Sequence, residues 1–327
     1  MALSSEDRKW LQEIIPDASW FDEPMARHTT LRVGGPAEVL VRPRDIGQLR
    51  SLVTGAEQRG LPVLVVGRGS NLLVRDGGIE GMVIDLSAGF RTIGFQGPPG
   101  PGGVCRVAAL AGARLAALCR FAISRGLAGI EFALGIPGSV GGAIAMNAGT
   151  AAGSMADVLE AVTVLTPAGR IRRLAARSLV FGYRKLSLPP DVVSENRSEQ
   201  TLILGGSLLL QPVDARELKV RARHLVQARR AAQPLKQPSA GSFFKNPPGG
   251  QSAGQLIDAA GFKGACIGGA AVSRQHANFI VNRGQATAAD ILGLIGRIQQ
   301  RVSARFGIRL EPEVVIVGRG LRAPKKS

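Results

Sequence analysis

The chain has few of the residues from which metal sites and disulfide frameworks are built. Among its 327 residues are three histidines and three cysteines, and the spacing of Cys105, Cys119 and Cys266 matches no metal-binding motif. A low, odd number of cysteines is typical of proteins in a reducing compartment. We therefore expect no bound metal, no disulfide framework and a cytoplasmic location.

Long apolar runs are also missing. No uninterrupted apolar stretch reaches the roughly 18 residues that a membrane-spanning helix requires. The first ten residues, Met1–Trp10, are charged and lack the apolar region of a secretory signal peptide. Because 45% of the residues are hydrophobic, the chain can still form a sizeable core. These features predict a soluble protein with no membrane partner.

Aromatic residues make up only 4% of the chain, whereas basic residues are abundant. Lysine and arginine number 41 against 24 acidic residues, a net charge of +17 that raises the hypothesis of nucleic-acid binding. The basic residues are dispersed, however, and aromatic platforms on which bases could stack are scarce. We expect the charge to attract small anionic ligands such as nucleotides, with no nucleic-acid partner, and nucleic-acid binding stays a competing hypothesis.

Strand and helix patterns predict three consecutive units, at residues 1–90, 91–213 and 214–327. The first contains a strand at 38–42, a helix from Asp45 to Gly60 and a strand at 62–66, which form a βαβ unit. The second contains strands at 104–109, 158–165, 170–174 and 201–210 and a helix at 113–125. The third contains helices from Asp214 to about Ala232 and from Thr287 to Phe306, and a final strand Glu313–Val317.

Glycine is abundant, with 43 residues, and three glycine-rich stretches have the composition of phosphate-binding loops. The first, residues 67–71, follows a predicted strand. It is neither a dinucleotide fingerprint nor a Walker A loop, because Leu72 replaces the third glycine and no Gly-Lys-Ser/Thr follows. The others are residues 135–142 and 147–149. Three such loops in two α/β units predict a large ligand that contains a pyrophosphate.

Residues 239–247, Ser-Ala-Gly-Ser-Phe-Phe-Lys-Asn-Pro, combine a hydroxyl at Ser242 with two aromatics, a cation at Lys245 and an amide at Asn246. We interpret this stretch as a loop that is anchored by its aromatic rings and holds a polar, anionic substrate over a reactive centre. An ordinary surface turn is the alternative, because Gly, Ser, Asn and Pro are common turn residues.

Seven segments in this order resemble the UDP-N-acetylenolpyruvoylglucosamine reductase family, also called UDP-N-acetylmuramate dehydrogenases. They are residues 28–35, 66–71, 135–142 with 147–149, 181–184, 240–247, 253–258 with 268–270, and 310–314. The resemblance implies an α+β chain: a vanillyl-alcohol-oxidase-type FAD-binding fold of two α/β subdomains, followed by a C-terminal α/β substrate-binding domain. The only tyrosine, Tyr183, lies in a Phe-Gly-Tyr-Arg motif, so the chain resembles the shorter type that lacks the tyrosine clamp loop.

The resemblance also implies an NADPH-dependent flavin oxidoreductase of peptidoglycan precursor synthesis, with roles in cell-wall biogenesis, cell shape and cell division. NADPH reduces non-covalently bound FAD and leaves. The enolpyruvyl ether of UDP-N-acetylglucosamine then accepts the hydride and a proton, giving UDP-N-acetylmuramate. Nothing in the sequence requires an oligomer, so we expect a monomer.

The family's catalytic residues fall on Arg184, Ser242 and Glu313. Arg184 and Glu313 are assigned to stabilising the enolate that hydride addition creates, and Ser242 to delivering the proton. Glu311 would share a strand face with Glu313, so the residues alone leave either carboxylate open, and the resemblance favours Glu313. Expected substrate-binding residues are Lys245, Asn246 and His276. Expected cofactor-binding residues are Gly67, Arg68, Gly69, Ser70, Asn71, Gly135, Pro137, Gly138, Ser139, Gly141, Gly142, Asn147 and Gly149.

One departure from the family pattern lies at Thr150–Gly153, where the usual Ala-Tyr-Gly is missing, so this loop is expected to touch the flavin differently. A flavoprotein oxidase or dehydrogenase of the same fold, acting on another substrate, stays open beside the reductase.

Overall fold

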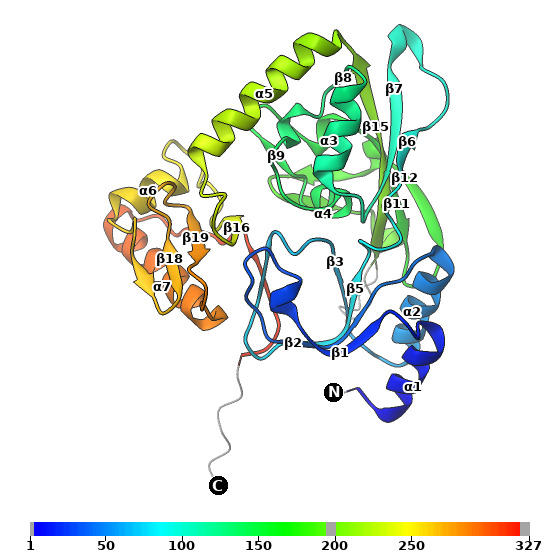
Figure 1. Cartoon of the computed structure of the whole chain (residues 1–327), viewed down its shortest axis with the longest axis horizontal. Coiled ribbons are helices and arrows are strands. Elements are labelled where there is room, and N and C mark those ends of the chain that lie inside the picture. Colours follow the sequence, from blue (N-terminus) through cyan, green and yellow to red (C-terminus); the bar gives the residue numbers. More distant parts are fainter. Residues whose placement is uncertain (1–2, 194–200, 321–327) are drawn as a thin grey trace. The chain divides into compact units, whose positions relative to one another are not determined.

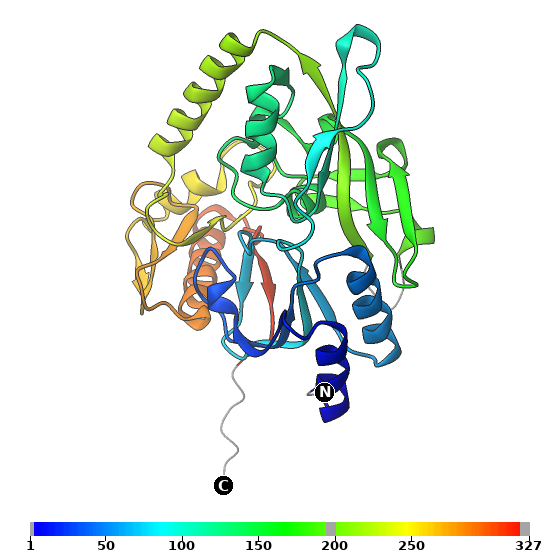
Figure 2. The same cartoon turned by 45° about the vertical axis from the view of Figure 1, so that its right-hand side comes forward.

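The structure of the chain, a computed structural model, describes residues 3–193 and 201–320. Within these residues the chain forms two compact units, each assembled from three separate stretches. The first unit contains residues up to 21, residues 39–67 and residues 81–228, and the second contains residues 22–38, 68–80 and those from 229 onward. Figures 1 and 2 show the elements of both units in two views.

The N-terminal part of the first unit is a small sheet with two helices. Its elements are α1 (Ser5–Ile14), β1 (Ser19–Pro24), β2 (Pro36–Val41), α2 (Ile46–Gln58), β3 (Val63–Val66) and β5 (Ile79–Asp85). The strand order is β1-β2-β5-β3, and β3 runs parallel to β5. The predicted helix after Asp45 is confirmed, since the Asp45 carboxylate accepts a hydrogen bond from the Gln48 N–H and apolar α2 side chains are buried. The two strands of the predicted βαβ unit are separated in the sheet by β5.

The larger part of the first unit is an antiparallel sheet covered by helices on one face (Figure 1). Its strands follow the order β12-β11-β15-β7-β6, and β8 pairs with the end of β15. The elements are β6 (Ile93–Phe95), β7 (Cys105–Leu110), α3 (Leu115–Ser124), β8 (Leu127–Ala128), α4 (Val140–Ala145), β11 (Leu159–Leu165), β12 (Ile171–Ala175) and β15 (Leu202–Pro212). Leu115, Leu118, Cys119, Val140 and Ile144 of α3 and α4 are buried in the core beneath this sheet.

Two short hairpins complete the first unit. They are β9 (Gly149–Thr150) with β10 (Gly153–Ser154), and β13 (Val180–Gly182) with β14 (Lys185–Ser187). Short 3-10 turns of the first unit lie at Pro101–Gly103, Glu131–Ala133, Met155–Asp157, Ala176–Ser178 and Pro190–Val192, and another, Met25–Arg27, lies in the second unit.

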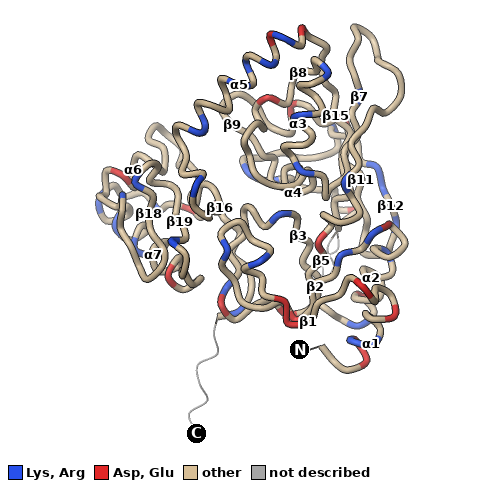
Figure 3. Tube along the Cα trace, in the orientation of Figure 1, with Lys and Arg blue, Asp and Glu red and all other residues tan. Residues whose placement is uncertain are grey.

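The long helix α5 (Ala215–Ala232) begins in the first unit and ends in the second. The Asp214 carboxylate accepts hydrogen bonds from the N–H groups of Arg216 and Glu217, both at 2.9 Å, as the predicted N-cap requires. Only Leu218 and Ala222 are buried, and basic residues recur along the helix (Figure 3). This helix carries part of the positive charge as a solvated surface.

The second unit has its own sheet, of order β16-β19-β18-β17, and its own core. Its elements are β4 (Leu72–Val74), β16 (Ser239–Ser242), α6 (Ala253–Ala259), β17 (Cys266–Ile267), β18 (Ala270–Val272), β19 (Phe279–Asn282), α7 (Ala288–Phe306) and β20 (Val315–Val317), which is parallel to β4. Thr287 caps α7 and Gly307 ends it in the left-handed conformation (φ 68°), where glycine has no Cβ penalty. The Asp76 carboxylate accepts bonds from the N–H groups of Ala288 and Ala289, so a distant segment also caps this helix.

The prediction of a loop at residues 239–247 is wrong for the first four residues, which form the edge strand β16. Ser239 pairs with Val281 and Ser242 pairs with Phe279, with an irregularity between the two pairs. Gly241 has a φ of 78°, which an L side chain rarely adopts, and this glycine fits the irregular step. The strand exists because β19 supplies the pairing partner, although glycine and serine have little strand preference of their own.

Candidate functional site

Ser242 lies at the end of β16, and buried groups fix the residues after it. The Phe243 and Phe244 side chains are 0% and 1% exposed, which confirms the predicted aromatic anchoring. Asn278 holds both main-chain groups of Phe244: the Phe244 N–H donates to Asn278 Oδ1 at 2.9 Å, and Asn278 Nδ2 donates to the Phe244 carbonyl at 2.8 Å. The Asn278 amide thus satisfies the same main-chain groups of Phe244 that a neighbouring strand would pair with. Ser242 is therefore attached to a rigid, buried segment.

Glu313 lies beside the same segment. Its N–H donates to the Phe243 carbonyl at 2.8 Å, and the Lys245 N–H donates to the Glu311 carbonyl at 2.9 Å. From the other side, Asn71 Nδ2 donates to the Glu313 carbonyl at 3.1 Å. The backbone of Glu313 is held by hydrogen bonds on both sides, and the structure brings the segments of Ser242 and Glu313 together.

The two candidate carboxylates differ in surroundings. The Glu311 side chain is 72% exposed and pairs with Lys245, with 3.2 Å between the Glu311 oxygen and Nζ. Glu313 is half-buried. The predicted final strand begins only at Val315, so neither glutamate lies in a strand and the expectation of a shared strand face is wrong.

The three expected substrate-binding residues all lie in the second unit. Lys245 faces Glu311, and Asn246 Oδ1 accepts a hydrogen bond from the Ala253 N–H at the start of α6. His276 contacts the Phe279 ring edge-on at 4.9 Å. Burial, and secondarily the charge of Lys263, lower the pKa of His276 below its ordinary value, so the imidazole is neutral near pH 7.

The first two glycine-rich loops meet in the first unit. Gly67 directly follows β3 and is the last residue of the stretch 39–67 of the first unit. A Cβ at this position would lie 2.1 Å from Ser139 Oγ. Ser139 is 3% exposed and caps α4, accepting a hydrogen bond from the Gly142 N–H at 3.3 Å. A side chain at position 67 would therefore force the Ser139 side chain to shift. The main chain of 138–141 is tied to residues 111–115 by hydrogen bonds such as Leu115 N–H to Gly138 O, so the loop is preformed.

The rest of the loop at 67–71 belongs to the second unit. The Gly69 carbonyl accepts a hydrogen bond from the Thr30 N–H at 3.2 Å, and a Cβ on Gly69 would lie 2.2 Å from the His28 carbonyl oxygen. The segment 28–35 that carried part of the family resemblance therefore packs directly on this loop.

Arg184 lies in the two-residue turn between β13 and β14, after Tyr183. Its φ is 57°, in the left-handed region, and its guanidinium lies 5.0 Å from the centre of the Tyr183 ring. Asn147 has a φ of 39°, and its Nδ2 donates to the Gly182 carbonyl at 3.1 Å. Sequence reasoning assigned Asn147 to the cofactor and did not find this contact, because nothing local connects residues 147 and 182.

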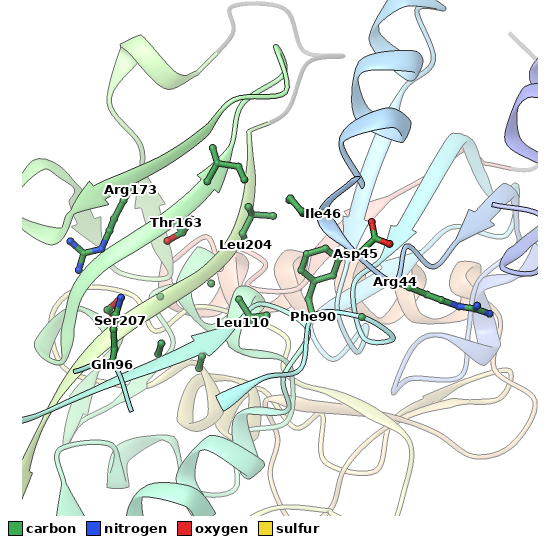
Figure 4. A pocket seen from close by; sticks show the side chains of 16 residues that line it. Arg44, Asp45, Ile46, Phe90, Gln96, Leu110, Thr163, Arg173, Leu204 and Ser207 are labelled. Atoms are coloured by element: carbon green, nitrogen blue, oxygen red, sulfur yellow. The ribbon is translucent and has the colours of Figure 1, made fainter. Parts of the chain in front are cut away.

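A separate cavity of about 440 Å³ lies in the first unit, against the strands β7, β11, β12 and β15 (Figure 4). Among its polar lining residues, Ser207 Oγ donates to Gln96 Oε1 at 2.7 Å, and Arg173 Nη2 donates to Glu160, which lies outside the lining, at 2.9 Å. None of the predicted catalytic, cofactor-binding or substrate-binding residues lines this cavity.

Across residues 3–193 and 201–320, no helix has the length and apolar character needed to cross a membrane. Within the same ranges, no group of three or more His, Cys, Asp or Glu side chains could hold a metal ion.

Comparison with known families defines the class of protein. Residues 37–175 match the family profile described as "FAD binding domain", and residues 233–317 match the profile described as "UDP-N-acetylenolpyruvoylglucosamine reductase, C-terminal domain". The glycine cradle at Gly67 and Ser139, which has no room for a Cβ, fits a bound cofactor of this kind. The chain is an FAD-dependent oxidoreductase.

Its relatives identify the family. The chain is 49% identical over 311 residues to the UDP-N-acetylenolpyruvoylglucosamine reductase of Desulfosudis oleivorans, covering 95% of this chain and 98% of that protein. It is 44% identical over 310 residues to the reductase of Heliobacterium modesticaldum, covering 95% and 91%. The crystal structure of the Thermus caldophilus reductase matches with a TM-score of 0.73 and 39% identity, covering 91% of this chain and 97% of that one. The chain belongs to the UDP-N-acetylenolpyruvoylglucosamine reductase family. The resemblance, the fold class and FAD as the cofactor are thereby confirmed.

Proposed function

We propose that this chain uses NADPH to reduce UDP-N-acetylenolpyruvoylglucosamine to UDP-N-acetylmuramate in peptidoglycan precursor synthesis. The observation that carries the proposal is the attachment of Ser242 and Glu313 to one buried segment, through the hydrogen bond from the Glu313 N–H to the Phe243 carbonyl. Bound FAD, held by the glycine loops, would supply the hydride transfer from NADPH to the methylene carbon of the enolpyruvyl group.

Each catalytic side chain meets a need of this reaction. Hydride addition to the alkene places negative charge on the carbon that bears the carboxylate, as an enolate. The planar guanidinium of Arg184 donates paired hydrogen bonds to that carboxylate and stabilises the charge as it develops. The Ser242 hydroxyl delivers the proton to the same carbon as general acid.

Glu313 is the proposed carboxylate of the site. Glu313 is half-buried, and hydrogen bonds with Phe243 and Asn71 fix its main chain. The position of its Cα is therefore well defined. Glu311 is highly exposed and paired with Lys245, which suits a surface ion pair better than catalysis. In this proposal the Glu313 carboxylate helps to stabilise the enolate that hydride addition creates.

The remaining proposed site residues bind either the substrate or the cofactor. Lys245 and Asn246 would hold the nucleotide's phosphates or sugar, and neutral His276 offers a hydrogen bond without adding charge. The glycine loops would hold FAD through main-chain N–H groups. The proposed cofactor residues are Gly67, Arg68, Gly69, Ser70, Asn71, Gly135, Pro137, Gly138, Ser139, Gly141, Gly142, Asn147 and Gly149.

We also propose that the enzyme acts as a monomer in the cytoplasm, without a membrane partner, and that residues 1–90, 91–213 and 214–327 are its domains. Through its product it would serve cell-wall biogenesis, cell shape and cell division.

The test uses the purified holoenzyme without oxygen. NADPH should bleach the yellow oxidised flavin, and the enolpyruvyl sugar nucleotide should then restore the colour and gain two hydrogens, which mass spectrometry detects. If the sugar nucleotide leaves the reduced flavin bleached, the substrate assignment fails and a flavoprotein acting on another substrate takes its place. A colourless protein that binds DNA in a salt-sensitive way would favour the nucleic-acid hypothesis.

A further inference from the structure

Two residues of the first unit, Asn147 and Arg184, have left-handed backbone conformations although neither is glycine. Asparagine tolerates this conformation, but arginine does so rarely, since its Cβ approaches the main chain. Such a conformation persists where the surrounding structure enforces it.

The hairpin that carries Arg184 is small. It has three residue pairs, from Val180 with Ser187 to Gly182 with Lys185. A two-stranded hairpin of this size is at best marginally stable alone. Phe181 and Leu186 pack against the core of the first unit, but Tyr183 in the turn is 54% exposed. The apolar contacts of Phe181 and Leu186 therefore hold the strands of the hairpin.

Asn147 supplies a support next to that turn. Its Nδ2 donates to the carbonyl of Gly182, the residue immediately before the turn, at 3.1 Å. Its Oδ1 accepts from the Ala156 N–H at 3.0 Å, in the 3-10 turn that follows β10. One partner is a carbonyl and the other an N–H, so only one orientation of the amide satisfies both. The side chain is thus a fixed brace between the β9–β10 region and the Arg184 turn.

We propose that Asn147 is a positioning residue for Arg184: its side chain acts through this brace, and its proposed contact with the cofactor is left to its main chain. The inference rests on the proposed role of Arg184 in the reaction. The hydrogen bond from Asn147 to Gly182 fixes the conformation of the turn and with it the direction of the Arg184 guanidinium. Without this bond the turn samples other conformations, so Arg184 is less often placed to bind the substrate carboxylate.

Asn147→Asp is the sharpest variant. Aspartate keeps an acceptor for the Ala156 N–H and also tolerates the left-handed conformation, but it puts an oxygen where Nδ2 donated to Gly182. Ser178→Ala is the matched control, because Ser178 is exposed in the same unit and loses only a local hydrogen bond to the Ala175 carbonyl. The first readout is amide hydrogen exchange of the holoenzyme over residues 180–187.

We expect Asn147→Asp to speed exchange in this hairpin about tenfold or more, while Ser178→Ala leaves it unchanged. Reoxidation of the reduced flavin by the sugar nucleotide should slow about tenfold or more. Unchanged exchange in the hairpin would overturn the proposal, and so would loss of flavin with the hairpin intact, which would make the Asn147 side chain a cofactor ligand.

A double-mutant cycle with Arg184→Lys separates this inference from the proposed function. If Asn147 acts through Arg184, adding Asn147→Asp to Arg184→Lys should slow reoxidation by less than about threefold further. Fully additive effects would show that Asn147 acts by another route and overturn the positioning role. If Arg184→Lys alone leaves reoxidation unchanged, the proposed function of Arg184 fails, and the positioning role falls with it, even where hairpin exchange responds.

Discussion

The main-chain N–H of Glu313 donates a 2.8 Å hydrogen bond to the carbonyl oxygen of Phe243, the residue that follows Ser242. Glu313 lies about seventy positions after Ser242 in the sequence, yet this bond and the burial of Phe243 place both on one scaffold. Any displacement of the Phe243 main chain is therefore shared by the proposed acid and the proposed carboxylate.

Replacing the hydroxyl tests the acid. Ser242→Ala should slow reoxidation of the reduced flavin by the sugar nucleotide by about 10²-fold or more, because the proton donor is lost, and should change reduction by NADPH far less. Anaerobic stopped-flow absorbance follows both half-reactions. Ser303→Ala, at an exposed position of α7, is the control. An equal slowing of both half-reactions would contradict the assignment.

Arg184→Lys keeps the charge but removes the planar fork. We expect kcat/KM for the sugar nucleotide to fall by about 10-fold to 100-fold, because an ammonium cannot donate paired bonds to a carboxylate. Lysine and arginine have the same backbone demands, so the left-handed turn should be unaffected. Arg177→Lys, exposed in the same unit, should behave as the parent in steady-state kinetics. Parent-like kinetics for Arg184→Lys would remove the residue from the mechanism.

Two glutamine variants decide between the carboxylates. Glu313→Gln should lower kcat by about 10²-fold, since it removes a charge beside the reaction centre. Glu311→Gln removes only an exposed ion pair with Lys245, so less than about a threefold change is expected. Steady-state kinetics of the pair, measured side by side, settles the choice, and the reverse order would transfer the role to Glu311.

Replacing Gly67 and Gly296 by alanine should change the stability of the folded protein in opposite directions. A Cβ at position 67 would collide with Ser139 Oγ, so Gly67→Ala should destabilise the protein by about 1–3 kcal/mol and reduce its flavin content. At Gly296, inside α7, nothing lies within 4 Å of the added Cβ. Gly296→Ala should stabilise by about 0.5–1 kcal/mol. Thermal unfolding and flavin absorbance check both, and a stable, fully loaded Gly67→Ala would mean that no cradle exists.

His276 should make stability depend on pH. Its pKa in the folded protein lies below the ordinary value of 6.5, first through burial and then through Lys263. The unfolded chain therefore binds the proton more readily, and the folded state loses stability as pH falls from about 6.5 toward the lower folded pKa. His276→Gln should shrink the difference in urea midpoint between about pH 7.5 and pH 5.5. Lys263→Gln should shrink it less, and an unchanged difference in His276→Gln would refute the linkage.

Local signals in the sequence predicted much of this fold. The capping residue Thr287 and the glycine after Phe306 mark both ends of α7, and Asp45 marks the start of α2, because such signals act within one turn of a helix. The family motifs indicated Ser242, Arg184 and Glu313 by number.

Contacts between distant residues were not predictable in the same way. Strand β16 forms because β19 pairs with it, against the weak strand preference of its own glycine and serine. The bonds of Asn278 to Phe244 and of Asn147 to Gly182 join residues more than 30 positions apart. An asparagine in a sequence does not reveal which main-chain group its amide will meet, so these braces become visible only in the folded chain.

The order in which the units can form follows from how the chain is shared between them. When residue 228 has been synthesised, every stretch of the first unit is present, but the second has only residues 22–38 and 68–80. Asp76 must wait for Ala288 and Ala289, more than two hundred residues later, before it can cap α7. During translation the two early stretches can contact each other, but they lack the partners in the second unit that come from residue 229 onward until the last third of the protein leaves the ribosome, and a chaperone would find them exposed in that interval.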